Sequence, residues 1–189
     1  MKIAQAELAA LFVVLLGGCA GQTTTDSVIY ERTGIPTAFR YAAADRDFRT
    51  VIYGNPTTAP KETFDASVIA AMQGRNWGAS TNFTTTPSER AREEYRVVMV
   101  FSGDRDIGGK AACRKIDSNA LSPIVDRVEL QAAFCFRETA LSHVHVGVGA
   151  FSDVNDPRLD RAVAQAVIHL FPLRDPFIER EHDREFPIP

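Results

Sequence analysis

The stretch Tyr95-Arg96-Val97-Val98-Met99-Val100-Phe101 is the strongest strand signal in the chain. Its residues are mostly β-branched or aromatic, which favours an extended backbone. They are apolar on nearly both faces, and a strand of that kind lies inside a sheet rather than at its edge. We therefore predict that residues 95–101 form the central strand of the domain.

Two strands are expected on the C-terminal side of this stretch, in residues 126–137 and 139–149. In the second, apolar and polar residues alternate, so His143 and His145 share one face of the strand. The turn near Glu138 would join the two strands as a hairpin. The alternating apolar residues are Val128, Leu130, Ala132, Phe134 and Phe136 in the first strand, and Val144, Val146 and Val148 in the second.

Earlier residues suggest more strands, at 39–41, at 48–53 and around Phe83, and one helix from residue 63 to Gly74. A second helix is expected from Asp156-Pro157 to Pro172, with Asp as its N-cap. This order predicts an α+β fold. It is a two-layer sandwich with a mostly antiparallel sheet of four to five strands and two helices packed on one face.

Composition limits the function classes. The chain has 189 residues, a net charge of −3 and a 45% apolar share, which fits a single packed domain without a basic surface for nucleic acid. Residues 103–110 match neither a phosphate-binding loop nor a calcium loop, so no cofactor is expected. Trp77, the only tryptophan, is expected to cover the core, and the alternative is an exposed binding anchor.

The N-terminus has the parts of a secretory signal, with an apolar run from Leu8 to Leu16. That run is well short of the roughly 20 residues that span a bilayer. Leu16-Gly17-Gly18-Cys19 resembles the bacterial lipobox, in which the peptide is cut before the cysteine and the cysteine receives a diacylglyceryl thioether. More than one acyl chain holds a protein stably in a membrane.

The resemblance implies a lipoprotein signal peptide (1–18), then the lipidated Cys19 and a flexible tether (19–36). A single α+β domain (37–172) and a charged, proline-bracketed tail (173–189) follow. In Gram-negative bacteria, Ala20 after the cysteine implies the outer membrane. Partners are then the membrane itself, through Cys19, and a possible envelope protein. The domain is similar to small envelope lipoproteins of unknown function in the order of its elements only.

With Cys19 assigned to the lipobox, Cys113 and Cys135 remain. In an oxidising compartment this pair predicts a disulfide, worth about 3 kcal/mol for a loop of that length. Two separate buried thiols are the alternative.

His143 and His145 are weak candidates for a metal site, because residues two apart on a strand can reach one ion. His169, His182 or Asp153 could supply a third ligand, although no spacing selects any of them. The alternative is two polar residues on the less buried face of a sheet, and we expect no metal. Since no catalytic set is found, we predict a non-enzymatic binding or accessory domain. The alternative is an envelope enzyme or metal-binding protein using His143 and His145.

Overall fold

The computed structural model describes residues 23–30 and 34–172. The predicted signal peptide (1–18), Cys19 and the predicted tail (173–189) lie outside these ranges. The strands are β1 (Thr24–Ile29), β2 (Arg46–Tyr53), β3 (Thr81–Thr84), β4 (Tyr95–Ser102), β5 (Arg127–Phe136) and β6 (Thr139–Gly149). The helices are α1 (Ile35–Ala43), α2 (Lys61–Met72), α3 (Gly109–Ala112) and α4 (Pro157–Leu170), with a 3-10 turn at Ser118–Ala120.

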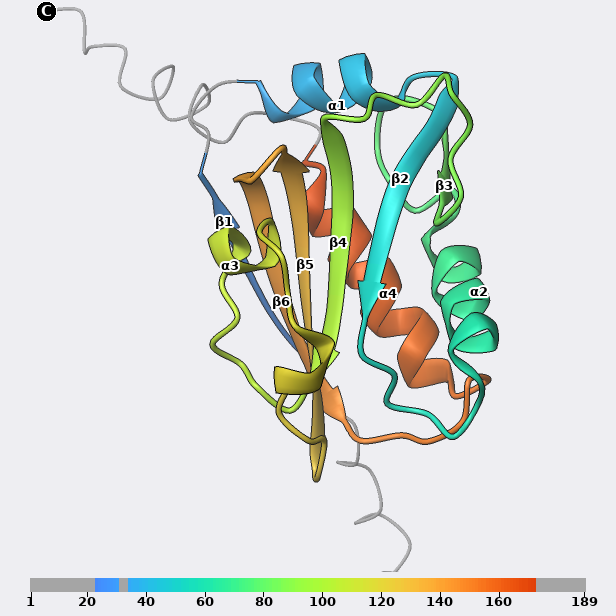
Figure 1. Ribbon diagram of the computed structural model, residues 1–189, viewed down its shortest axis with the longest axis vertical. Helices are drawn as coiled ribbons and strands as arrows, with labels where there is room; N and C mark the ends of the chain where they lie inside the picture. Colours follow the sequence, from blue (N-terminus) through green and yellow to red (C-terminus); the bar gives the residue numbers. More distant parts are fainter. Residues whose placement is uncertain (1–22, 31–33, 173–189) are drawn as a thin grey trace, which may run out of the picture.

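The six strands form one mixed sheet in the order β1-β6-β5-β4-β2-β3 (Figure 1). The pairs β1–β6, β6–β5 and β5–β4 are antiparallel, whereas β2 runs parallel to both β4 and β3. The α+β class is confirmed, but the sheet is mixed and has six strands rather than the predicted four to five. The described residues form four α-helices rather than the predicted two. Helix α2 is the reason for the parallel pairing of β2 and β3: it carries the chain from the end of β2 back to the start of β3, as a parallel pair requires.

Strand β4 lies between β5 and β2, so its central position is confirmed. Val97 and Met99 face the helices, and Val98 and Val100 face the other side of the sheet. All four side chains are at most 1% exposed. The apolar character of both faces in the sequence therefore reflects burial on both faces.

Residues 39–41, predicted to be a strand, belong to helix α1, which lies across one end of the sheet. Pro36 stands in its first turn, where proline favours a helix. Ile35, Phe39 and Ala42 follow one another at helical spacing and are buried. Phe39 stacks on Phe171 with ring centroids 4.0 Å apart, so tertiary packing outweighs the local strand propensity.

Helix α4 packs against β5 and β6 on one face of the sheet, and α2 packs against α4 (Figure 1). Ser142 Oγ, on β6, donates to the Leu170 carbonyl oxygen at the end of α4 at 2.8 Å. The core between these helices and the sheet is rich in aromatic rings. The rings that contact one another there are Phe39, Phe48, Phe83, Phe134 and Phe171.

The opposite face of the sheet is also covered. The segment 103–125, which includes α3, lies over β4, β5 and β6 and is held there by the disulfide between Cys113 and Cys135, whose Cα atoms are 5.6 Å apart. The predicted disulfide is therefore present. Arg96, from β4, adds a hydrogen bond from Nη2 to the carbonyl oxygen of Cys113 at 2.5 Å. We call the sheet surface beneath this segment the covered face.

Residues 24–29 fall in the range predicted to be a tether, yet they form the edge strand β1. Its register on β6 runs from Thr24 opposite Gly147 to Ile29 opposite Ser142. The folded sheet therefore begins at Thr24 rather than near Phe39. Within residues 23–30 and 34–172, no helix is long and apolar enough to cross a membrane.

Candidate functional site

His143 and His145 lie on the same face of β6, as predicted, but that face is the covered face. The two residues are 8% and 5% exposed, so the expectation of a less buried polar face is wrong. The missing information was long-range: the segment 103–125 folds back over the sheet and is fixed by the disulfide. The imidazoles therefore do not open onto solvent.

His143 is part of a short chain of hydrogen bonds beneath the segment 103–125. Its Nε2 lies 2.9 Å from Oε1 of Gln131 on β5, and the Gln131 amide nitrogen donates to the carbonyl oxygen of Arg105 at 2.9 Å. Because the amide nitrogen faces Arg105, its oxygen faces the imidazole and accepts from Nε2. His143 thus ties the sheet to the segment that covers it.

The pKa of His143 is lowered from its ordinary value of 6.5 to about 4. Burial is the largest cause, because it disfavours the charged imidazolium, and the charge of neighbouring His145 adds to it. A backbone hydrogen bond at Ile107 opposes these effects in part. His143 is therefore neutral at neutral pH.

His145 lies in an ionic cluster that joins three strands. Its Nε2 is 2.6 Å from Glu129 Oε2 on β5, and its Nδ1 is 3.6 Å from Asp26 Oδ2 on the edge strand β1. Arg105 binds the same Asp26 carboxylate at 2.8 Å, and Arg127 Nε lies 3.3 Å from Glu129 Oε1. The cluster therefore fastens β1 to the sheet and to the covering segment.

These residues do not come together as a metal centre. Among the described residues, no group of three His, Cys, Asp or Glu side chains is placed to hold an ion. His169 lies exposed on α4, on the helical side of the sheet, and Asp153 lies in the loop before α4, so neither reaches the covered face. His182 lies outside the described residues.

Gly109, in α3, makes the close packing over His143 possible. A Cβ atom at this position would lie 2.7 Å from His143 Cβ and 2.8 Å from Tyr30 Cε2. Contacts that short require the neighbours to move, so only glycine fits here without a shift. Tyr30, directly after β1, and α3 thus close the covered face together.

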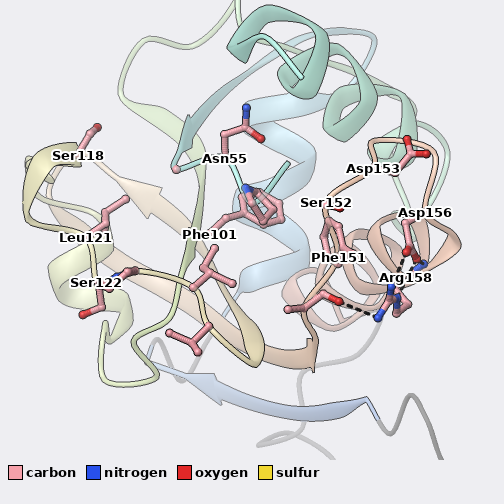
Figure 2. A pocket seen from close by; sticks show the side chains of 16 residues that line it. Asn55, Phe101, Ser118, Leu121, Ser122, Phe151, Ser152, Asp153, Asp156 and Arg158 are labelled. Atoms are coloured by element: carbon pink, nitrogen blue, oxygen red, sulfur yellow. Dashed lines mark hydrogen bonds and ion pairs between the residues drawn. The ribbon is translucent and has the colours of Figure 1, made fainter. Parts of the chain in front are cut away.

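An open concave surface lies elsewhere in the described part of the chain. A pocket of about 670 Å³ lies where the parallel strands β2 and β4 end, and Figure 2 shows the side chains around it. Phe101 and Phe151 are its buried aromatic residues, at 2% and 6% exposed. The loop before β5 supplies Ser118, Leu121, Ser122, Pro123, Ile124 and Val125, and the region around the start of α4 supplies Ala150, Ser152, Asp153, Asp156 and Arg158.

Two local features shape this pocket. Gly54 has a φ of +76°, and a Cβ there would lie 2.0 Å from the Phe101 carbonyl oxygen, so the turn after β2 needs glycine. Asp156 caps the N-terminus of α4 and binds Arg158, with 2.6 Å between Oδ2 and Nη2. The hydrogen bond from Arg158 is the main reason that the pKa of Asp156 is lowered. Arg158 also donates to the Ala150 carbonyl oxygen at 2.8 Å, which fixes this wall.

Aromatic and polar side chains both line the pocket. The described residues that line it include no histidine or cysteine, whereas serine hydroxyls and the Asp153 carboxylate surround its aromatic residues. The sequence predicted the local structure of two sides of the pocket: a turn at Gly54-Asn55-Pro56 and the start of a helix at Asp156-Pro157. Their meeting depends on the parallel pairing of β2 and β4, which local patterns do not reveal. The carboxyl ends of parallel strands are a common place for ligands.

The prediction for Trp77 was wrong. Trp77 is 52% exposed and lies in the loop between α2 and β3. Asn76 holds this loop by donating to the Ala79 carbonyl oxygen at 2.8 Å, and Gly74 and Gly78 both have positive φ. Phe83, on the strand that follows the loop, is fully buried in the core.

The fold is that of a small α+β domain whose mixed six-stranded sheet is covered on both faces. No protein-family model matches the chain, and no curated protein matches its sequence. Among solved structures it is similar to a PelC dodecamer from Paraburkholderia phytofirmans, at 9% identity and a TM-score of 0.45, over 81% of this chain and 100% of that one. A point variant of the same PelC matches with a TM-score of 0.43, at the same identity and coverage. Likeness of this degree assigns no function to the chain.

Proposed function

We propose that this chain is a lipid-anchored domain of the bacterial envelope, held in the membrane through Cys19, which binds another envelope component and catalyses no reaction. The lipobox-like Leu16-Gly17-Gly18-Cys19 supports the anchor. Strand β1 begins at Thr24, so only four residues separate it from Cys19. The domain is therefore tethered closely to the bilayer.

The binding role is carried by one observation, the open pocket beside Phe101 and Phe151. A concave site with aromatic residues and a few polar groups is the usual form of a binding site. The imidazoles that could have carried chemistry are buried in the covered face and hydrogen bonded there. The pocket is thus the surface through which the domain acts.

The place of the domain is the periplasmic side of the outer membrane, if the host is Gram-negative. The support is Ala20, the residue after the anchor cysteine, since aspartate at that place in lipoproteins favours the inner membrane. Fractionation of inner and outer membranes from the native host tests this directly. Recovery in the inner membrane would contradict it.

Replacing the anchor tests the first half of the proposal. The Cys19→Ser chain should lose metabolic labelling by palmitate and should move from the membrane fraction to the soluble periplasmic fraction. Cys113 and Cys135 stay in place, so the fold is kept. A Cys19→Ser chain that remains in the membrane would show that the attachment is something other than a lipid.

Filling the pocket tests the second half. Ser152→Trp places a large ring at the exposed edge of the pocket, and Thr63→Trp places the same ring on the exposed side of α2 as a matched control. An envelope component that copurifies with the lipidated wild-type chain should be lost from the first variant and kept by the second. Equal capture by both variants would exclude the pocket as the binding surface.

A further inference from the structure

Residues 122–126, which we call the tip loop, present apolar side chains to solvent just before β5. Val125 is 76% exposed, the highest fraction among the large hydrophobic side chains in the described part of the chain, and Pro123 is exposed as well. Ile124, between them, is partly buried and packs against the core. An isolated exposed valine has no meaning by itself, but a cluster at one end of a molecule can mark a contact surface.

The tip loop is held firmly in this position. Gly103 donates its amide to the Ser122 carbonyl oxygen at 3.0 Å, and Ala150 donates its amide to the Asp126 carbonyl oxygen at 2.9 Å. A Cβ on Gly103 would lie 2.1 Å from the Pro123 carbonyl oxygen, so the glycine permits this approach. Two neighbouring chain segments thus keep Val125 pointing outward.

The tip loop lies at the end of the domain where the chain leaves for Cys19. Arg127, the first residue of β5, donates from Nη2 to Thr24 Oγ1 at 3.3 Å, which puts the start of β1 beside the base of the loop. Figure 1 shows the loop at the lower end of the domain, where β1 begins. Four residues separate Thr24 from Cys19, so a lipid on Cys19 lies within about 17 Å of Thr24.

We propose that the tip loop is a membrane-contacting surface, with Val125 entering the interfacial region of the bilayer that holds Cys19. The proposal rests on the lipid anchor of the proposed function and adds the orientation of the domain to it. Apolar groups at a membrane surface reach about 5–10 Å into the headgroup region, a depth that the short tether permits. The pocket, which Val125 also lines, then opens next to the bilayer.

The contact is apolar rather than electrostatic. Asp126 and Arg127 follow Val125 with opposite charges, and Arg127 is already paired with Glu129 at 3.3 Å. Attraction between exposed charges weakens as salt screens it, whereas apolar burial does not. Contact of the tip loop with lipid should therefore persist at high salt.

The chain carries its own internal control, because Trp77 is the only tryptophan and lies at the opposite end of the sheet. The loop of Trp77 is tied to the start of β2 by the bond from Asp45 N to Ser80 O, whereas the tip loop lies beyond the end of β4, which runs parallel to β2. The eight residues of β2 span about 26 Å. Trp77 should therefore stay outside the bilayer.

The test uses the full lipidated chain in vesicles of phosphatidylethanolamine and phosphatidylglycerol whose acyl chains carry bromine, a contact quencher of tryptophan. The wild-type chain reports on Trp77, and the double variant Trp77→Phe/Val125→Trp reports on the tip loop. Relative to unbrominated vesicles, we expect the fluorescence of the double variant to fall about twofold or more, as befits a side chain at interfacial depth. The wild-type fluorescence should stay nearly unchanged, and added salt should alter neither result.

Flotation of the same vesicles separates the two possible failures. Protein that floats but shows no quenching in the double variant, or equal quenching in both proteins, overturns the orientation and leaves the anchor intact. Protein that does not float overturns the anchor and the orientation with it. The Cys19→Ser form of the double variant should be unquenched. If it is quenched as strongly as the lipidated form, the introduced indole binds lipid by itself and the proposal fails.

Discussion

His145 and Glu129 form a buried pair across two strands, with Nε2 2.6 Å from Oε2. In the register of β5 on β6 the residue opposite His145 is Gln131, so the pair with Glu129 is diagonal. Both side chains are about one tenth exposed, at 7% and 11%. Removing one partner leaves the other buried without its hydrogen bond, which is costly.

Glu129→Ala should therefore lower the free energy of unfolding by about 1–3 kcal/mol, whereas Glu129→Gln, which keeps an acceptor, should cost less. Urea denaturation followed by circular dichroism measures both. The control is Asp160→Ala, which removes an exposed pair with Arg75 and should change stability by about 0.5 kcal/mol or less. A Glu129→Ala cost no larger than that of the control would mean that the cluster does not support the fold.

The lowered pKa of His143 predicts a loss of folding stability in mild acid. The folded pKa of about 4 lies below the ordinary 6.5, so between these values the unfolded chain takes up a proton that the folded chain does not. The contribution of His143 to stability is therefore complete above about pH 6.5 and declines as the pH falls toward 4, by up to about 3 kcal/mol.

The measurement is urea denaturation at pH 7 and at pH 5. His143→Gln should lose less stability than the wild type between the two conditions, because glutamine does not titrate. His169→Gln, at an exposed position on α4, should behave as the wild type does. If His143→Gln loses as much stability between pH 7 and pH 5 as the wild type does, groups other than His143 cause the loss.

The disulfide should matter because it closes the segment over the covered face. Cys113 and Cys135 are 22 residues apart, and in the chain-entropy model a loop of this size contributes about 3 kcal/mol. The double variant Cys113→Ser/Cys135→Ser should lose about that amount and show faster hydrogen exchange in residues 103–125. Reductant should destabilise the wild type and leave the double variant unaffected. Equal stability of the two proteins under oxidising conditions would show that the disulfide does not stabilise the fold.

Two adjacent glycines give a matched pair of substitutions. Gly109→Ala places a Cβ against His143 and Tyr30 and should cost about 1–3 kcal/mol through overpacking. At Gly108 a Cβ meets nothing within 4 Å and the backbone is ordinary, with a φ of −70°, so Gly108→Ala should be nearly neutral. Thermal unfolding of the two variants compares them. Similar melting temperatures would mean that α3 can move away from β6 at little cost.

Some features of this protein follow from local sequence alone. The position of β4 does, because a strand that is apolar on both faces must be buried on both. Helix α4 does too, because Asp156, Pro157 and a periodic apolar stripe define its start and its buried side. The alternation in β6 also sufficed to place His143 and His145 on one face. Each of these signals is a relation between residues close together in the chain.

Tertiary structure decided the rest. Helix α1 forms where residues 39–41 prefer a strand, because Phe39 stacks on Phe171, which is distant in sequence. The parallel pairing of β2 with β4 brings Gly54 beside Phe101 and so creates the pocket. The covering segment turns two expected surface histidines into buried ones. Pairing partners and burial depend on contacts between segments far apart in the chain, and no local pattern encodes them.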